Sequence, residues 1–182
     1  MTRIVGGSAG GRRLAVPATG TRPTSERVRE ALFSRLDHRG LLDGARVLDL
    51  YAGSGALGLE ALSRGAASAV LVDSSRTAVA VCRSNASALG FADRVTVIGR
   101  KVEQLLAGRA PTRTSTMVFI DPPYDLGVDR MLRLLMRPGW LADGAAVVLE
   151  QSTRAGEPTW PDGLVPEDGK VYGETVLWFA SN

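Results

Sequence analysis

An alternation of strand-like and helix-like segments restricts the fold of this 182-residue chain more than any other feature. Short apolar runs predict five buried strands, at 47–50, 69–73, 95–98, 116–120 and 145–150. Helical patterns follow the first four strands, to about 64 and over 74–89, 103–106 and 128–136. Repeated strand–helix units imply a parallel sheet with helices on both faces, so the fold class is α/β. Two extended stretches within 170–180 then predict a hairpin that adds antiparallel strands.

The segment before this alternation has a different character. Two short β-like stretches, 3–5 and 13–16, flank a glycine-rich turn and predict a small hairpin. Thr24 is a candidate N-cap for a helix over 24–38. We therefore expect a basic hairpin arm at 1–22, a domain at 23–182, and the helix between them.

Composition excludes several classes of protein. The single cysteine, Cys82, rules out an internal disulfide and a cysteine metal cluster, and the single histidine, His38, rules out a histidine metal site. We expect Cys82 to be buried and His38 to end a helix. No signal peptide or membrane span is recognisable. We expect a cytoplasmic protein that needs no metal or membrane, as a monomer.

The net charge of +3 conceals an asymmetry. Residues 1–39 contain eight arginines and three acidic residues, a net charge of +5, while residues 40–182 contain fourteen basic and sixteen acidic residues. A basic arm made only of arginine favours contact with nucleic-acid phosphates, because the guanidinium fork binds phosphate and stacks on bases. The alternative is ordinary solvated surface charge. The candidate RNA-binding residues are Arg3, Arg12, Arg13, Arg22, Arg27 and Arg29.

A glycine-rich turn follows the first strand of the alternation. Residues 53–58 match G-x-G-x-x-G, and Asp73 ends the next strand. Glycines let backbone amides approach a ligand, and the acidic residue can accept hydrogen bonds from a ribose. This pattern fits both dinucleotides and S-adenosylmethionine. Asp49 favours S-adenosylmethionine, since a carboxylate at the mouth of the loop suits an ammonium group and would repel a pyrophosphate. Gly58 is expected to permit close helix–strand packing.

The sequence Asp121-Pro122-Pro123-Tyr124 follows the fourth strand. The prolines end the strand, so a carboxylate and an aromatic ring are presented at its carboxyl end, where open α/β sheets bind ligands. Asp121 and the Pro122 carbonyl could hydrogen-bond an amino group conjugated with a ring and aim its lone pair at an incoming methyl group. Tyr124 could stack on the base. The alternative is a plain turn after a strand.

Taken together, these residues resemble a known family. Residues 47–65 (VLDLYAGSGALGLEALSRG) and 121–124 look like two motifs of the class I S-adenosylmethionine-dependent amino-methyltransferases. The stretches RIVGG, GRRLAVP and TRPTSERVREALF within 3–33, together with Tyr172-Gly173-Glu174-Thr175, resemble the bacterial 16S ribosomal RNA guanine-N2 methyltransferases. The resemblance covers nearly the whole chain.

The resemblance implies a Rossmann-like domain with a seven-stranded, mostly parallel sheet, preceded by a hairpin arm. It implies methyl transfer from S-adenosylmethionine to a guanine N2 of 16S ribosomal RNA, in the assembled or assembling small subunit. Asp49, Gly53 and Gly55 would hold the methionine part of the cofactor, and Asp73 its ribose. Residues 121–124 would hold the guanine amine, and Arg22, Arg27 and Arg29 would contact RNA near the site. We also expect Tyr51 and Ser74 to bind the cofactor.

One position departs from the family pattern. Relatives commonly have an acidic or amide residue after the third strand, near the cofactor adenine, whereas this chain has Lys101. Lysine cannot accept a hydrogen bond from the adenine amine. The backbone amide of Val102 could still donate one to the ring.

Other functions remain open on the sequence alone. An amino-methyltransferase could act on adenine N6 of DNA or on a protein amide, although the chain has no insertion long enough for a DNA-recognition region. A dinucleotide-dependent oxidoreductase would leave the Asp-Pro-Pro-Tyr turn and the basic arm unexplained. The third alternative is a non-catalytic RNA-binding or ribosome-assembly factor on the same fold.

Overall fold

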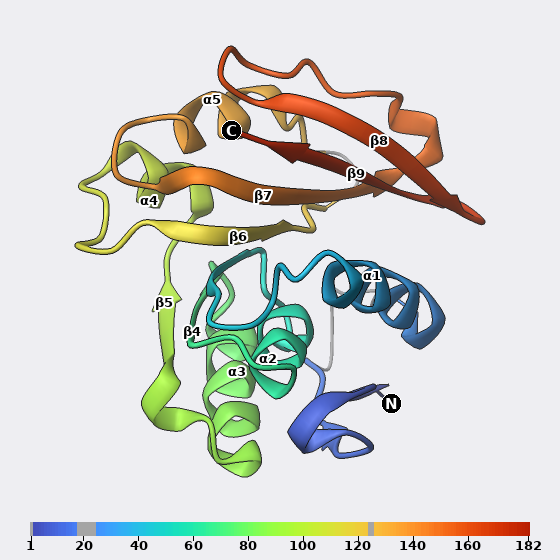
Figure 1. Ribbon diagram of the computed structural model, residues 1–182. Coiled ribbons are helices and arrows are strands. Elements are labelled where there is room, and N and C mark those ends of the chain that lie inside the picture. The colour runs from blue at the N-terminus through green and yellow to red at the C-terminus, as the bar shows by residue number, and fades with distance from the viewer. Residues whose placement is uncertain (1, 18–24, 124–125) are drawn as a thin grey trace.

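The computed structural model describes residues 2–17, 25–123 and 126–182 (Figure 1). Its main sheet has seven strands in the order β5-β4-β3-β6-β7-β9-β8. The first five of these strands run parallel, and β9 and β8 form an antiparallel hairpin beside β7. The strands are β3 (Arg46–Leu50), β4 (Ser68–Asp73), β5 (Val95–Gly99), β6 (Ser115–Ile120), β7 (Leu141–Ser152), β8 (Val165–Tyr172) and β9 (Thr175–Ser181). The expected α/β fold with a mostly parallel seven-stranded sheet is confirmed.

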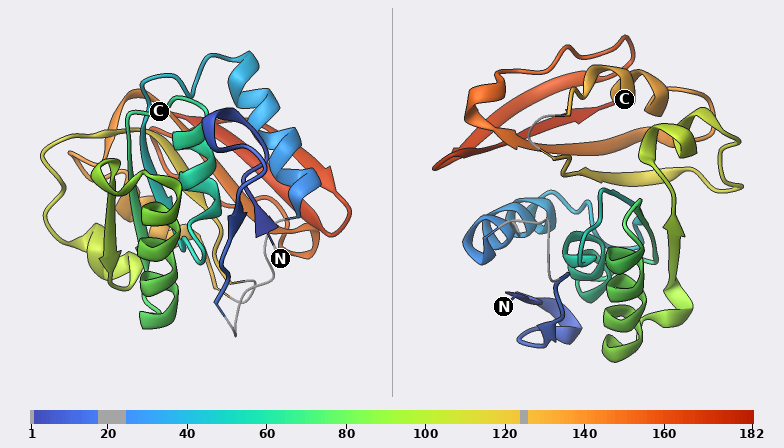
Figure 2. Two further views of the ribbon diagram at one scale, coloured as in Figure 1. Left: turned by 90° about the horizontal axis from the view of Figure 1, so that it is seen from below. Right: turned by 180° about the vertical axis from the view of Figure 1, so that it is seen from behind.

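Helices cover both faces of this sheet, as the views from below and behind show (Figure 2). One face carries α1 (Glu26–His38), α2 (Ala56–Ser63) and α3 (Arg76–Leu89), and the other carries α4 (Val102–Ala107) and α5 (Asp129–Leu135). Short 3-10 turns occur at Gly7–Ala9, Ala92–Arg94 and Thr153–Ala155. Two apolar cores result, one on each face, because the central strands β3 and β6 are buried on both sides. No helix in the described part of the chain is long and apolar enough to cross a membrane.

The sheet changes its winding direction between β3 and β6. Strands β4 and β5 follow β3 on one side, while β6 and β7 extend the sheet on the other. In such sheets, ligands bind in the crevice at the carboxyl ends of the strands on either side of the switch. The glycine-rich turn follows β3 and the Asp-Pro-Pro segment follows β6, so the topology brings both sequence motifs to this crevice.

The N-terminal arm is a hairpin of β1 (Thr2–Arg3) and β2 (Arg13–Leu14), paired antiparallel. Its strands are shorter than expected, but its buried Ile4 and Leu14 join the core shared with α1 and α2. The helix α1 begins later than expected: Ser25 rather than Thr24 is its N-cap and accepts a hydrogen bond from the Val28 amide. The helix ends at His38, as expected.

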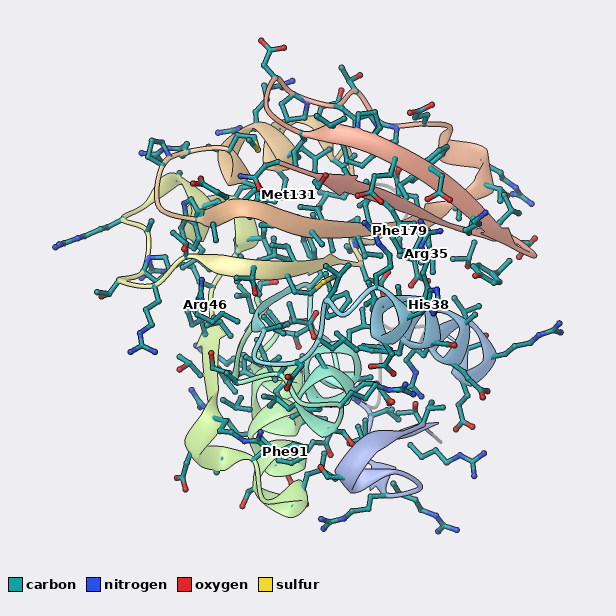
Figure 3. The ribbon with its side chains drawn as sticks, viewed as in Figure 1. Arg35, His38, Arg46, Phe91, Met131 and Phe179 are labelled. Atoms are coloured by element: carbon teal, nitrogen blue, oxygen red, sulfur yellow. The ribbon has the colours of Figure 1, made fainter. Side chains whose placement is uncertain are left out.

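The C-terminal hairpin of β8 and β9 is bound to α1 by arginine side chains. Arg35 lies 3.9 Å from the centre of the Phe179 ring and donates two hydrogen bonds to Asp168, of 2.9 and 2.7 Å (Figure 3). Arg39 makes a second paired contact, with Glu167. Arg35 and Arg39 therefore hold the C-terminal hairpin against α1.

Candidate active site

The candidate site lies where β3, β4 and β6 end. The Ala52 amide donates to the Val72 carbonyl at 2.9 Å, which ties the glycine-rich turn to β4. The Asp121 amide donates to the Leu50 carbonyl at 3.3 Å, which ties the Asp-Pro-Pro segment to β3. The two sequence motifs, about seventy residues apart in the chain, therefore adjoin in space.

Glycines shape the turn between β3 and α2. Gly53 and Gly55 have positive φ angles of 56° and 78°, and Gly55 is the N-cap of α2. A side chain on Gly58 would come within 2.4 Å of Leu71, which confirms that this glycine permits close helix–strand packing. Gly53 and Gly55 thus supply the positive φ angles of the turn, and Gly58 permits the close approach of α2 to β4.

Asp73 holds this turn from the end of β4. Its carboxylate accepts hydrogen bonds from the Gly53 amide at 2.9 Å and the Ser75 amide at 2.8 Å. Each oxygen keeps a second lone pair, and the side chain is only partly buried, so it can still accept hydrogen bonds from a ribose. The neighbouring Ser74 is exposed beside it.

The position of Asp49 differs from the expectation. The side chain lies beneath the turn rather than at its mouth, is 1% exposed, and accepts a hydrogen bond of 2.9 Å from the Gly58 amide. It satisfies one of the orphan donors in the first turn of α2. Burial raises the pKa of Asp49 to about 7, the Gly58 hydrogen bond opposes this, and the negative Asp73 adds to it.

Tyr51 connects this turn to the end of β5. It is the one non-glycine residue with a positive φ angle, 65°, in the described ranges. Its hydroxyl donates a 2.8 Å hydrogen bond to Glu103, next to Val102 at the start of α4. The Val102 side chain is buried, whereas Lys101 is exposed just before it. The residues expected to bind the cofactor, which follow or end β3, β4 and β5, thus lie close together.

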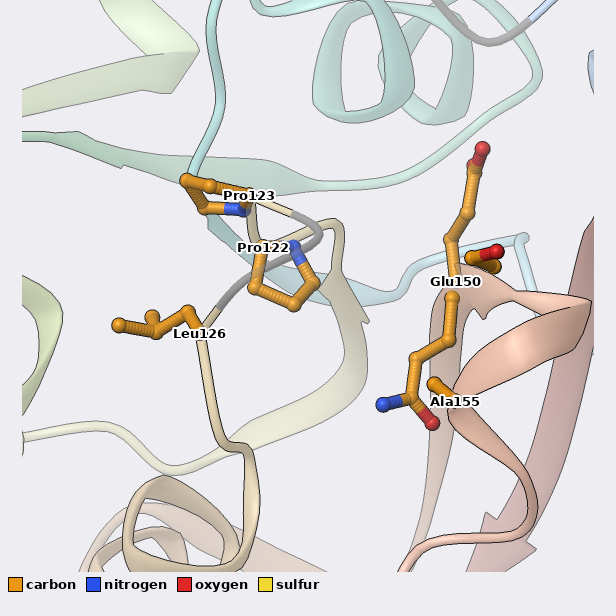
Figure 4. A pocket seen from close by; sticks show the side chains of 7 residues that line it. Pro122, Pro123, Leu126, Glu150 and Ala155 are labelled. Atoms are coloured by element: carbon orange, nitrogen blue, oxygen red, sulfur yellow. The ribbon is translucent and has the colours of Figure 1, made fainter.

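The acceptor side of the site follows β6. Pro122 and Pro123 line a small pocket with Glu150 and residues at the end of β7 (Figure 4). The cavity volume is about 10 Å³, room for about one water molecule. Asp121 is partly buried, and Tyr124 lies outside the described residues.

Sequence reasoning missed Glu150. It lies at the carboxyl end of β7, the strand paired with β6, and is 7% exposed. The signal was a charged residue at the end of an otherwise apolar run. No group of three or more His, Cys, Asp or Glu side chains within the described ranges could hold a metal ion.

Four of the six candidate RNA-binding arginines, Arg3, Arg12, Arg13 and Arg27, are exposed. Arg3 pairs with Glu26 but keeps 59% of its side chain exposed. Arg13 faces Arg3 across the hairpin, and Arg27 is exposed on α1. Arg22 lies outside the described residues.

One candidate, Arg29, lies inside the protein, which differs from the expectation. Arg29 is 1% exposed and donates to the Thr2 hydroxyl at 2.7 Å and the Arg3 carbonyl at 2.8 Å. Burial lowers its pKa, against the opposing charges of Glu60 and Glu26. Helical spacing could have shown this, because Arg29 shares a face with Leu32, Phe33 and Leu36. Arg12 donates to the carbonyls of Ala88 and Leu89, which end α3.

Comparisons with known proteins agree with this geometry. A model of the family described as Conserved hypothetical protein 95 matches residues 2–181. The Ribosomal RNA small subunit methyltransferase D of Escherichia coli K12 is 40% identical over 176 residues, which cover 96% of this chain and 86% of that protein. Its Haemophilus influenzae counterpart is 32% identical, over 98% of this chain and 90% of that one.

Solved structures show the same fold. The Escherichia coli protein yhhF has a TM-score of 0.88 and 36% identity, covering 99% of this chain and 97% of that one. An RNA methyltransferase from Salinibacter ruber, in complex with S-adenosyl-L-homocysteine, has a TM-score of 0.63 and 20% identity, over 88% and 93% of the chains. At that identity, the second likeness concerns the fold alone.

The site fits S-adenosylmethionine on its own geometry. Asp73 is only partly buried, lies beside the exposed Ser74 at the end of β4, and keeps acceptor capacity that suits the hydroxyl groups of a ribose. Together with the matched family model, these features show that the chain belongs to the small-subunit ribosomal RNA methyltransferase D family, which depends on S-adenosylmethionine.

Proposed function

We propose that this protein methylates the exocyclic N2 of one guanine in 16S ribosomal RNA, within the assembled or assembling small subunit. Supporting this, its relatives are named small-subunit ribosomal RNA methyltransferases, and its arm exposes Arg3 and Arg13. A carboxylate, Asp121, also lies next to the cofactor turn. Such a substrate would place the enzyme in the cytoplasm as a monomer, since the proposed site needs no second subunit.

The observation that most strongly supports the proposal is the position of Asp121 beside the end of β3. Its amide hydrogen bond to Leu50 fixes the start of the Asp-Pro-Pro segment one strand away from the cofactor turn. When bound, S-adenosylmethionine supplies a methyl group on a sulfonium, a good leaving group that needs little acid–base assistance. The main contribution of the protein is alignment, which can supply about 7–11 kcal/mol.

In this proposal, Asp121 accepts a hydrogen bond from the guanine N2 amine and turns its lone pair toward the methyl group. As the nitrogen–carbon bond forms and the carbon–sulfur bond breaks, the amine becomes cationic, and its proton passes to Asp121 or to water. The Pro122 carbonyl is a second acceptor for the same amine. The pocket beside Pro122 is smaller than a nucleobase, so the side chains around it must move when a guanine leaves its RNA stack and enters.

The test of this role is Asp121→Ala. Small subunits from a strain that lacks this protein provide the unmethylated acceptor. We expect the variant to bind S-adenosyl-L-homocysteine within about threefold of the parent protein and to lose about 10²–10⁴-fold in methyl transfer. Undiminished turnover would refute the role of Asp121.

The same assay separates the proposed function from its alternatives. With a radiolabelled methyl donor, label should enter ribosomal RNA and digest to N2-methylguanosine. Label in ribosomal protein or in added DNA would support the other amino-methyltransferase functions. Cofactor binding without label in any acceptor would support a non-catalytic assembly factor.

A further inference from the structure

The arm is held by a helix that begins at the cofactor turn. Glu60 of α2 is completely buried and accepts hydrogen bonds from the Val5 amide at 2.6 Å and the Gly6 amide at 2.8 Å. Ser63, one turn further on, accepts from the Ala9 amide at 2.9 Å and donates to the Gly6 carbonyl at 2.5 Å. The arm is thus attached to α2 by its backbone rather than by its arginines.

A second attachment reaches the cofactor turn itself. Asn85 of α3 is 4% exposed, and its side-chain oxygen accepts from the Ala15 amide at 2.9 Å. Its side-chain nitrogen donates to the Ala15 carbonyl and also to the Ser54 carbonyl, both at 2.9 Å. Ala15 directly follows β2 of the arm, and Ser54 lies between the two glycines of the turn. One planar carboxamide therefore joins the arm to the cofactor turn.

All the donors of this carboxamide are used inside the protein. Its two N–H groups each have a carbonyl partner, and neither Ala15 nor Ser54 could keep these bonds if the arm moved relative to the turn. A site is held in its productive geometry by neighbours whose own rotamers are fixed by hydrogen bonds. Asn85 fixes the Ser54 carbonyl of the turn in this way, and it fixes the backbone of Ala15 in the arm in the same way.

We propose that Asn85 is a positioning residue that couples RNA binding on the arm to cofactor binding at the glycine turn. The proposal rests on the proposed function, since it takes ribosomal RNA as the partner of the arm. Whichever ligand binds first fixes the Ala15–Asn85–Ser54 connection and favours the geometry that the other requires. Thermodynamic linkage then makes the effect reciprocal, so each ligand raises the affinity of the protein for the other ligand by the same factor.

The experiment measures this factor directly. The affinity of the protein for unmethylated small subunits is measured with and without saturating S-adenosyl-L-homocysteine, and the ratio of the two dissociation constants is the coupling factor. The variant Asn85→Leu removes all three hydrogen bonds and keeps a similar size. Ser63→Ala is the matched control, because it loosens the arm from α2 without touching the turn.

We expect a coupling factor of at least about fivefold in the parent protein and in Ser63→Ala, the lower end of typical allosteric coupling. In Asn85→Leu it should fall to within twofold of one. A parent protein without coupling, or an Asn85→Leu protein that keeps it, would overturn the inference.

Two further measurements keep the result interpretable. If Asn85→Leu does not fold, Ala15→Pro weakens the connection from the exposed arm side by removing the Ala15 N–H, one of the two hydrogen-bonding groups that join Ala15 to Asn85, and a partial loss of coupling is expected. If the parent protein neither binds nor methylates the subunits, the proposed function fails rather than the role of Asn85.

Discussion

Among individual residues, Asp49 makes the clearest prediction about stability. Its pKa is raised from an ordinary 3.8 to about 7, so between these pH values the folded protein holds a proton that the unfolded chain has lost. The contribution of Asp49 to the free energy of unfolding therefore falls as pH rises from about 4 to 7, by up to about 4 kcal/mol for a pKa difference of about three.

The variant Asp49→Asn removes this ionisation while its side-chain oxygen can still accept from the Gly58 amide. We expect it to be more stable than the parent protein at pH 8, by up to about 4 kcal/mol, and similar at pH 4. Urea denaturation of the ligand-free proteins across this range measures the difference. Parallel pH curves for the two proteins would show that Asp49 does not titrate as described.

Arg27 and Arg29 form a matched pair on the same helix. Arg29→Ala removes two buried hydrogen bonds to the arm and leaves a cavity, so it should lower the free energy of unfolding by about 2–4 kcal/mol. Arg27→Ala changes only an exposed side chain and should stay within about 0.5 kcal/mol. Chemical denaturation compares the two, and equal losses would contradict the different placement of these side chains.

These residues also show what the sequence could predict. The helix containing Arg27 and Arg29 follows from its apolar spacing, but a charged side chain was assigned to the surface by its type alone. Burial of Arg29 depends on Thr2 and Arg3, which are far away along the chain. Helical spacing indicates that Arg29 faces the core, but local patterns contain no information about which groups it meets there.

At the scale of elements, the turns were more predictable than the strand ends. The glycine turn after β3 requires positive φ angles and close packing, and the spacing of its glycines in the sequence indicates both. The start of β8 was missed by five residues, because Pro166 and Gly169 are poor strand formers. They are tolerated since β8 is an edge strand with a register irregularity between Pro166 and Asp168.

In the candidate site too, local sequence patterns predict the strand ends but not the contacts between residues that are distant in the chain. Asp73 ends β4 and Asp121 directly follows β6, as the apolar runs predict, and parallel strands bring such ends to one crevice. The connection of the arm to this crevice could not be predicted in the same way. It depends on Glu60 and Asn85, polar residues on the buried faces of α2 and α3 whose partners lie some 55 to 70 residues away.

Across the whole molecule, the charge asymmetry predicts how RNA binding responds to salt. Arg3 and Arg13 are cross-strand neighbours on the arm, and each phosphate contact releases about 0.7–0.9 counterions. The double variant Arg3→Ala/Arg13→Ala should therefore bind small subunits more weakly and flatten the slope of log affinity against log salt by about 1.4–1.8.

The control for this prediction is Arg109→Ala/Arg113→Ala, which removes the same charge. These two residues are exposed in the loop before β6, at the opposite end of the sheet from the candidate site. If RNA meets the arm and the carboxyl ends of the strands together, the control should leave the salt slope within about 0.5 of the parent value. Equal flattening by both double variants would mean that total charge, rather than the position of the arm, governs binding.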